Sequence, residues 1–424
     1  MVWIGLFSVY SMASMVYGEI VIDVTASDQA AIPIAVVPFG WESAASQPED
    51  IAKIVHANLQ RSGFFQTMPP SAMPAQPHSM STVDFNQWSQ VKMEHLVVGH
   101  LAPQADGQYE VQFQLLDVYQ KNQSVGLKFV VPVKDLRRTA HRISDIIYEK
   151  LTGHKGAFDT RIAYITLVRE GKKNAYQLQV ADADGQNPKT ILKSPQPLMS
   201  PSWSANGESL AYVSFEQGQS SIYIQHLTTG QRQKISSSKG INGAPSWSPD
   251  GKKLAITLSK DGSPDIYVVE LASGKQQRLT SDRAIDTEPV WTKDSSSIVF
   301  TSDRGGKPQL YRVSASGGQA TRLTFTGEYN ARPIISPDGK LLAMVHGENG
   351  QYHIATLELE SGNFQVLTDG ELDESPSFAP NGQMILYATQ ANNRGVLAAV
   401  SIDGRVKQRL SMHQGNVQEP AWSP

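Results

Sequence analysis

PSWSPDG at residues 245–251 decides the fold of this chain, because variants of it recur at a nearly fixed interval. The variants are PSWSANG from Pro201, PVWTKDS from Pro289, PIISPDG from Pro333, PSFAPNG from Pro376 and PAWSP from Pro420. Neighbouring prolines are 44 residues apart, except for one interval of 43. A repeat of this length predicts an architecture built from identical structural units, each packing against its neighbours.

Each period contains further segments typical of strands. After the Asp-Gly turn at 250–251 come LAITLS (254–259), DIYVVEL (265–271) and a short third run that ends in RLT (278–280). Alternating apolar residues bounded by Gly, Asp, Asn and Pro indicate strands joined by hairpins. With the proline segment as the innermost strand, each period has four antiparallel strands, which is one blade of a β-propeller.

The two ends of the repeat array predict how the ring closes. Residues 161–168, 176–182 and 190–192 supply three strands of a blade that lacks its first strand, whereas the segment from Pro420 is a first strand alone. We expect these segments to share one blade, so that no unpaired edge is left between them. The fold class is therefore an all-β six-bladed propeller at residues 161–424, preceded by a smaller domain.

Residues 19–152 lack the repeat and predict a small α+β domain, followed by a linker at 153–160. Runs at 34–39, 96–101, 109–118 and 125–131 are typical of strands, and 48–62 and 134–151 are typical of helices. Residues 66–82, rich in Pro, Ser, Met and Gln, predict a loop.

The first 18 residues are apolar or small and are followed by Glu19, which predicts a cleaved signal peptide at 1–18. No Lys or Arg precedes the apolar run, so an uncleaved anchor is the alternative. No later segment predicts a membrane span in the mature chain. The formal net charge of −3 gives no basic field for nucleic acid. The absence of cysteine excludes disulfides, thiolate metal sites and a cysteine nucleophile.

Large apolar residues stand two positions after the repeated prolines. They could form a ring that stacks on a ligand, but packing between blades is the interpretation we favour. They are Trp203, Trp247, Trp291, Ile335, Phe378 and Trp422. The Ser-Pro-Asp-Gly segments resemble calcium-binding loops, yet hairpin-turn chemistry is a sufficient reason for them.

The loops that enter the innermost strands open on one mouth of the central channel. These loops carry a net charge of −5, more than that of the whole chain, and they are 193–200, 236–244, 280–288, 324–332, 368–375 and 411–419. We expect an acidic mouth that attracts a basic or amide-rich partner, or a cation. The acidic residues are Asp286, Glu288, Asp373, Glu374 and Glu419.

An enzyme is the main alternative, because propellers with such turns also assist peptidases. The chain has no G-x-S-x-G and no H-E-x-x-H motif, and no carboxylate pair is marked as catalytic by its spacing. We therefore predict no catalytic residues, no metal site and no cofactor. A propeller that gates a peptidase, or one that binds a small ligand or glycan, remains the alternative function.

Several stretches resemble the TolB family, the periplasmic components of the Tol-Pal system of Gram-negative bacteria. The resemblance covers the whole mature chain and rests on IPIAVVPF (32–39), PEDIAKIV (48–55), EKLTGHKGAF (149–158), RIAYI (161–165), SPQPLMSPSWS (194–204), NGAPSWSPDGKKLA (242–255) and TEPVW (287–291). It implies a non-catalytic protein that binds the lipoprotein Pal of the outer membrane and TolA of the inner membrane. It also implies a role in outer-membrane invagination during cell division and in outer-membrane integrity, and use of the same surface by colicins.

The resemblance assigns the binding residues as well. The Pal-binding positions that match are Asn242, Gly243, Ala244, Thr287, Glu288 and Pro289, and the TolA-binding segment is Glu19, Ile20, Val21, Ile22 and Asp23. This segment alternates in polarity and could add as an edge strand to a partner. An ordinary first strand of the α+β domain is the alternative, and the segment could also switch between docked and free states.

Overall fold

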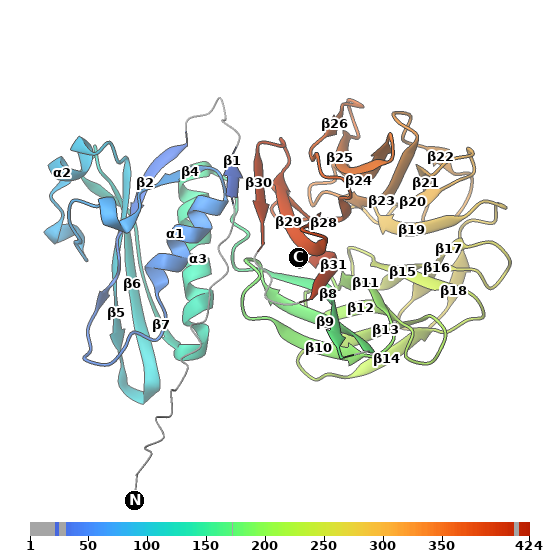
Figure 1. Cartoon of the computed structure of the whole chain (residues 1–424), viewed down its shortest axis with the longest axis horizontal. Helices are drawn as coiled ribbons and strands as arrows, with labels where there is room; N and C mark the ends of the chain where they lie inside the picture. Colours follow the sequence, from blue (N-terminus) through green and yellow to red (C-terminus); the bar gives the residue numbers. More distant parts are fainter. Residues whose placement is uncertain (1–21, 25–30, 172, 411–414) are drawn as a thin grey trace, which may run out of the picture.

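The structure, a computed structural model, describes residues 22–24, 31–171, 173–410 and 415–424. The proposed signal peptide at 1–18 lies outside these residues. A small domain with two long helices packs against one side of a ring of blades (Figure 1). Within the described residues, no helix is both long enough and apolar enough to cross a membrane.

Blades 1 to 3 each contain four antiparallel strands, numbered outward from the channel. Blade 1 consists of β11 (Leu198–Trp203), β12 (Ser209–Ser214), β13 (Ser221–His226) and β14 (Arg232–Ser236). Blade 2 consists of β15 (Asn242–Trp247), β16 (Lys253–Leu258), β17 (Asp265–Glu270) and β18 (Gln276–Arg278). Blade 3 consists of β19 (Asp286–Trp291), β20 (Ser297–Ser302), β21 (Gln309–Ser314) and β22 (Thr321–Arg322).

The remaining blades complete the ring. Blade 4 consists of β23 (Tyr329–Ile335), β24 (Leu341–Glu348), β25 (Gln351–Glu358) and β26 (Phe364–Val366). Blade 5 consists of β27 (Glu374–Phe378), β28 (Met384–Ala391), β29 (Arg394–Ser401) and β30 (Val406–Arg409). The closing blade consists of β31 (Asn416–Trp422), β8 (Arg161–Glu170), β9 (Lys173–Asp182) and β10 (Lys189–Ser194). The predicted six-bladed propeller is therefore confirmed.

The ring closes as the sequence predicts. β31 pairs antiparallel with β8, in a register that runs from Asn416 opposite Leu167 to Trp422 opposite Ile162. Ser423 N donates to the Arg161 carbonyl at 2.8 Å, and Arg161 N donates to Ser423 Oγ at 3.0 Å. The C-terminal strand thus has hydrogen bonds to the first propeller strand along its length.

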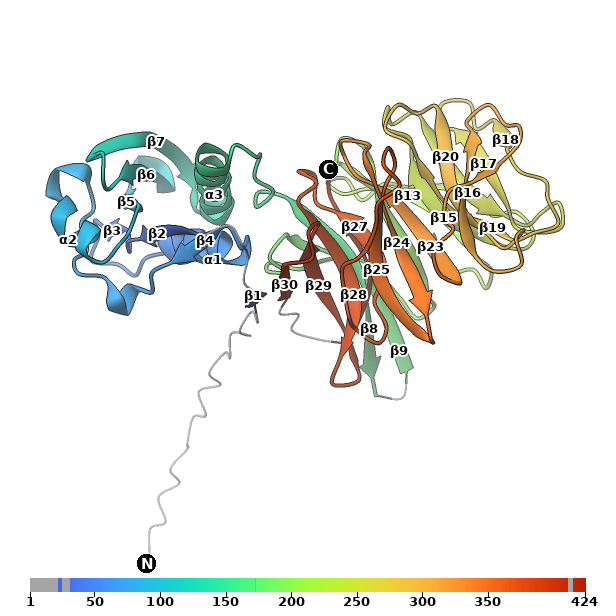
Figure 2. The ribbon, with the colours of Figure 1, turned by 90° about the horizontal axis from the view of Figure 1, so that it is seen from above.

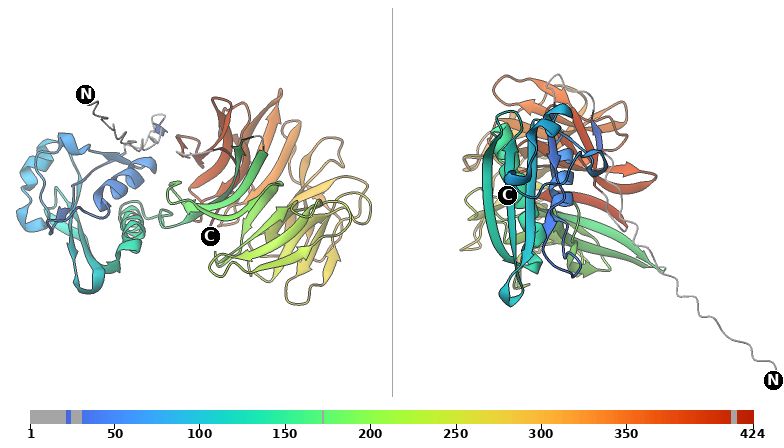
Figure 3. Two further views of the ribbon diagram at one scale, coloured as in Figure 1. Left: turned by 60° about the horizontal axis from the view of Figure 1, so that its bottom comes forward. Right: turned by 90° about the vertical axis from the view of Figure 1, so that its left-hand side faces the viewer.

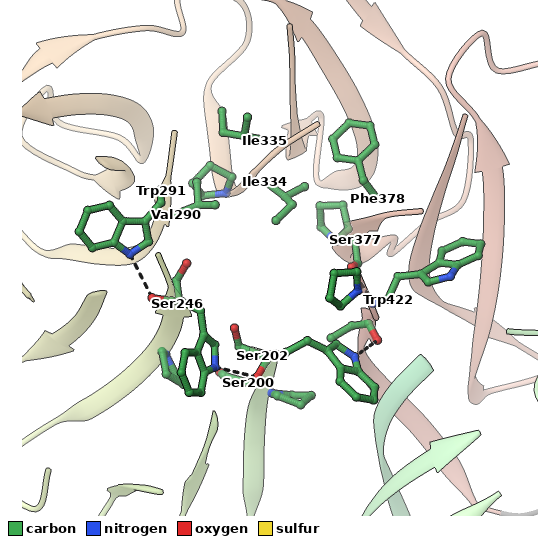
Figure 4. Close-up of a pocket in the computed structure, with 18 of the residues that line it drawn as sticks. Ser200, Ser202, Ser246, Val290, Trp291, Ile334, Ile335, Ser377, Phe378 and Trp422 are labelled. Carbon is green, nitrogen blue, oxygen red and sulfur yellow. Dashed lines mark hydrogen bonds between the residues drawn. The ribbon is translucent and has the colours of Figure 1, made fainter. Parts of the chain in front are cut away.

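Tryptophans on the innermost strands join neighbouring blades. The indole Nε1 of Trp203 donates to the Ala421 carbonyl at 2.9 Å, that of Trp247 to Ser202 at 3.2 Å, and that of Trp291 to Ser246 at 3.1 Å. Each acceptor belongs to the preceding blade (Figure 4). This geometry supports packing between blades and leaves the indole N–H groups bonded to backbone, as buried polar groups require.

The N-terminal domain is one mixed sheet with helices on both faces. Its strand order is β4 (Phe65–Thr67), β2 (Ile32–Val36), β5 (His95–Pro103), β6 (Gln108–Asp117) and β7 (Asn122–Pro132), and β3 (Gly40–Trp41) pairs with β5. Helices α1 (Ile51–Arg61) and α3 (Leu136–Thr152) cover the face turned toward the propeller (Figure 2). The opposite face carries α2 (Phe85–Gln90) and three-residue 3₁₀ turns at 70–72 and 80–82; two more lie at 105–107 and 133–135.

Helix α1 shows how the sequence sets these elements. Asp50 caps it by accepting a hydrogen bond from Lys53 N at 3.0 Å, and its apolar residues at helical spacing, such as Ile51, Val55 and Leu59, are fully buried. The sequence missed the two-residue β3 and two further elements here. β4 is three residues long and lies at the start of the predicted loop 66–82, and α2 is a single short helix around the buried Trp88.

Residues 22–24 do not join the N-terminal sheet. They form β1 (Ile22–Val24), which pairs antiparallel with β30, the outer strand of blade 5, with Ile22 opposite Gln408 and Val24 opposite Val406. The alternative that this segment is the first strand of the α+β domain is therefore wrong (Figures 1 and 2). A free outer strand of a blade offers unpaired N–H and C=O groups, and β1 uses those of β30.

Candidate channel-mouth site

A backbone feature that repeats in all six blades shapes the central channel. The residue before each inner proline has positive φ, between 45° and 56°: Ser200, Ala244, Glu288, Arg332, Ser375 and Glu419. At the same place every inner strand has a register irregularity against its neighbour. Non-glycine residues rarely adopt positive φ, so this bulge is a strained conformation held by its surroundings.

These six residues, which we call the channel ring, line a cavity of about 410 Å³. The cavity continues past the inner prolines and past Ser202, Ser246, Val290, Ile334 and Ser377 toward the hairpin turns (Figure 4). Its two halves differ in chemistry. The ring contributes charged and hydroxyl groups, whereas prolines and tryptophans dominate the rest of the lining.

Arg332 forms ion pairs with both acidic residues of the channel ring, Glu288 and Glu419. Its Nε lies 3.2 Å from Glu288 Oε1 and its Nη2 lies 3.9 Å from Glu419 Oε1, while Nη1 donates to Ser375 Oγ. Glu288 Oε2 accepts from Arg332 N at 3.0 Å and from Thr301 Oγ1 at 2.9 Å. Glu419 accepts from Ser200 N. One network therefore joins five of the six ring positions.

Burial sets the protonation of this network. Burial raises the pKa of Glu419, while the charge of Arg332 and the hydrogen bond from Ser200 N lower it by less. For Arg332, burial opposes the charge, but Glu288 and Glu419 together raise its pKa above the ordinary value. The guanidinium is therefore held charged between two carboxylates. Ala244 is the one ring position without a polar side chain.

The predicted Pal-binding residues lie at this mouth, but they differ in accessibility. Asn242 is 1% exposed, and its side chain accepts from Ser236 Oγ at 2.6 Å and donates to the Ser238 carbonyl at 2.7 Å. It therefore holds the preceding loop in place. Gly243 and Ala244 are partly exposed, and a Cβ on Gly243 would meet only Ile241 at 3.8 Å. The sequence placed both residues in a loop, whereas they belong to β15.

The second predicted group occupies the equivalent part of β19. Thr287 is partly exposed and its Oγ1 lies 3.4 Å from Thr257 Oγ1 of the preceding blade. Glu288 belongs to the channel ring, and Pro289 is buried. Gly243, Ala244 and Thr287 are thus the predicted positions whose side chains or backbone are open at the mouth and free of the ionic network.

The prediction of an acidic mouth assumed five carboxylates without a counter-charge, and it is wrong for three of them. Asp286 is buried and accepts from Arg304 Nη2 at 2.7 and 2.9 Å, and Glu288 and Glu419 are paired with Arg332. Arg304 follows β20, outside the loops in which charges were counted. The count of charges therefore left out Arg304, and although it included Arg332, it could not show that Arg332 lies between Glu288 and Glu419.

The predicted TolA-binding segment is described only in part. Ile22 and Asp23 belong to β1 and pair with Gln408 and Lys407 of β30, whereas Glu19, Ile20 and Val21 lie outside the described residues. Within the part of the chain that the structure describes, β1 pairs with β30 at three residue positions. Short strand additions of this kind rely on backbone hydrogen bonds, which another strand can also supply.

The fold and the mouth together define the chain as a two-domain β-propeller protein with a charged ring at one end of its channel. Comparisons with known proteins agree with this architecture. The family model of the TolB beta propeller domain matches residues 148–424, and that of the TolB amino-terminal domain matches residues 20–124. The chain belongs to the TolB family of Tol-Pal system proteins.

Two relatives illustrate the similarity. The Tol-Pal system protein TolB of Nitrosococcus oceani is 62% identical over 411 residues, covering 96% of this chain and 94% of that protein. The protein of the same name from Thioalkalivibrio sulfidiphilus is 62% identical over 405 residues, covering 95% and 93%. The crystal structure of TolB from Acinetobacter baumannii has a TM-score of 0.87 and 42% identity, and the match covers 96% of this chain and 100% of that one.

Proposed function

We propose that this chain is a non-catalytic protein of the periplasm that binds Pal through the channel mouth and TolA through its mature N-terminal segment. In this role it links the outer and inner membranes, supports outer-membrane invagination during cell division and maintains outer-membrane integrity. Colicins would compete for the same surface.

The channel ring is the observation that carries the proposal. Six strained residues hold the mouth in a fixed shape, and a rigid surface loses little conformational entropy on binding a protein partner. Gly243, Ala244 and Thr287 leave open space beside the polar network, where a partner's backbone or small side chain could enter. The paired carboxylates favour recognition through shape and hydrogen bonds over recognition through long-range charge.

The position of β1 supports the second half of the proposal. A three-residue strand at the outer edge of blade 5 contributes little stability to the propeller, so it can leave β30 and pair with a strand of TolA. β1 lies at the outer edge of a blade, whereas the channel mouth is formed by the inner strands. The two partners would then not compete for the same residues.

A binding experiment with purified Pal and TolA tests both halves. We expect Ala244→Leu to weaken Pal binding at least tenfold and to leave TolA binding unchanged, because the leucine side chain would fill the open ring position. Deletion of residues 19–23 should have the reverse effect. If both variants bind both partners like the unmodified chain, the assigned surfaces are wrong. Turnover of a peptide or glycan by the chain would instead support an enzymatic role.

A further inference from the structure

A buried ionic cluster joins the N-terminal domain to the closing blade, away from the channel mouth. Helix α1 contributes Arg61, and helix α3 contributes Arg137 and His141. Asp182 is the last residue of β9, and Asp184 lies in the turn that follows. Arg137 Nε donates to Asp182 Oδ2 at 3.0 Å, and Arg137 Nη2 donates to Asp184 Oδ2. We call these five residues the interdomain cluster. Helices α1 and α3 lie on the side of their domain that faces the blade (Figure 3).

The cluster is balanced in charge and mostly buried, although the side chains of Arg137 and Asp182 are 17% and 29% exposed. The exposed fractions are 7% for Arg61, 2% for His141 and 8% for Asp184. Two guanidinium groups face two carboxylates, so the sum of charges is zero only while His141 is neutral. Arg137 already donates to both carboxylates, which leaves the cluster complete without an additional cation.

His141 has no hydrogen-bond partner for one ring nitrogen. Its Nδ1 lies 2.9 Å from Asn58 Nδ2, which can only donate, so the proton of the neutral ring is on Nε2. Nε2 lies 3.9 Å from Asp182 Oδ2 and 3.8 Å from Asp184 Oδ2, beyond hydrogen-bond distance, and has no other partner. A second proton, on Nδ1, would lose the bond from Asn58 and place a third positive charge beside Arg61 and Arg137.

We propose that the interdomain cluster is a pH-sensitive latch, which holds the N-terminal domain on the closing blade at neutral pH and opens when His141 is protonated. Protonation is favourable only when solvent reaches the imidazole, and that requires separation of α3 from the turn after β9. Opening would leave other connections in place, among them the hinge at 153–160, the bond from Asn381 Nδ2 to the Lys155 carbonyl, and β1. It would also have to separate Gly63 from Val406 of blade 5.

Protonation of His141 favours the open form because the imidazole is buried in the closed form and reaches solvent in the open form. Burial, and then Arg61 and Arg137, lower the pKa of His141 from 6.5 to about 3, while Asp184 acts in the opposite direction. The closed state therefore loses stability relative to the open state as pH falls below 6.5, tenfold for each pH unit until about pH 3. Between pH 7.5 and pH 5 the titration of His141 by itself should lower the ratio of closed to open forms about 30-fold.

Asp145, one helical turn beyond His141, titrates in the opposite sense. Burial raises the pKa of Asp145 to about 6, although its carboxylate accepts from Phe158 N and Asp159 N. Its contribution remains when His141 is replaced, so a His141 variant separates the two groups. The pKa of Asp182 is raised by burial and by Asp184, and that of Asp184 is lowered by Arg61, His141 and Arg137 against the effect of burial.

Cysteine labelling measures the opening, because the chain has no cysteine of its own. Ala183 is 3% exposed and lines a small cavity between the domains, whereas Ala343 is fully buried between blades 4 and 5. Labelling of Ala183→Cys in the full mature chain, divided by the rate of a short cysteine peptide at the same pH, reports the open fraction. Ala343→Cys reports opening of the propeller itself.

The expected result is that the normalised rate at position 183, divided by the rate at the same position in a chain that also carries His141→Gln, increases about 30-fold from pH 7.5 to pH 5, with no matching increase at position 343. His141→Gln, which cannot be protonated in this range, should remove this contribution. Asp184→Asn should raise the rate already at pH 7.5. Arg138→Gln is the matched control, because Arg138 lies on the same helix and pairs with Asp159 but its side chain is 74% exposed. The proposal is wrong if the rate at position 183 has the same pH dependence with and without His141→Gln, or if the rates at positions 183 and 343 increase equally.

Discussion

Replacement of Arg332 by leucine tests whether the channel ring depends on its ionic network. The change removes the partner of Glu288 and Glu419 and leaves the carboxylate of Glu419, whose side chain is 9% exposed, without a counter-charge. Breaking a buried ion pair typically costs 3–5 kcal/mol. The Arg332 side chain is 33% exposed, so solvent compensates in part, and we expect a loss of about 2–4 kcal/mol in the free energy of unfolding.

Equilibrium denaturation followed by tryptophan fluorescence is a suitable assay, because four of the seven tryptophans lie on the inner strands. The second substitution Glu419→Gln, added to Arg332→Leu, should recover about half of the loss, since it removes the unpaired charge. A loss below about 0.5 kcal/mol, or a double variant no more stable than Arg332→Leu, would refute the reasoning.

The same variant has a defined pH dependence. Burial already raises the pKa of Glu419, and loss of the guanidinium raises it further. A carboxyl whose folded pKa lies above its unfolded value stabilises the fold at low pH, and this contribution is lost as pH rises through the folded pKa. Arg332→Leu should therefore be closer to the unmodified chain in stability at pH 5 than at pH 8.

Four further outcomes follow from the geometry. Ala244→Gly should keep Pal binding and should not lower stability, because glycine adopts the observed φ of 45° freely, so it is the control for the weakened binding of Ala244→Leu. Trp291→Ala should lower the free energy of unfolding by about 3–5 kcal/mol in denaturation experiments, since it empties a site that is 4% exposed. Deletion of Pro420–Pro424 should expose β8 as an edge and cause self-association, visible by light scattering. Deletion of Glu19–Asp23 should leave the thermal midpoint of the propeller within about 2 °C, because those residues lie outside the repeat array.

The sequence predicted the propeller well, since every blade is a copy of one local pattern. The repeats have a proline, usually an aromatic residue and an Asp-Gly or similar turn at the same spacing. A blade whose own pattern is weak can therefore be assigned from the pattern of the other five. The closure of β31 on β8 followed from an incomplete first period and an incomplete last one. The N-terminal domain has no such redundancy, and its short elements β3, β4 and α2 were therefore missed.

The site was predicted less completely, and the reason lies in long-range contacts. Asp286 and Arg304 are 18 residues apart, and Arg332 and Glu419 are 87 apart, so no pattern in neighbouring residues shows that they pair. The docking of β1 on β30 joins the two ends of the chain, with Ile22 opposite Gln408. Nothing in the composition of residues 19–23 distinguishes a strand of the propeller from a strand of the first domain.

The strained backbone of the channel ring explains why its residues differ so much in type. Positive φ before proline normally selects glycine or asparagine, yet the six positions are Ser, Ala, Glu, Arg, Ser and Glu. Each such conformation costs about 1–3 kcal/mol, so the surrounding strands must impose it. The inner prolines and the paired strands on either side hold the same bulge with four different side-chain types, so the bulge itself does not dictate the residue. A scaffold that sets the backbone of six residues around one axis, and fixes most of their side chains in one network, presents a rigid surface that is suited to recognising a protein partner at that axis.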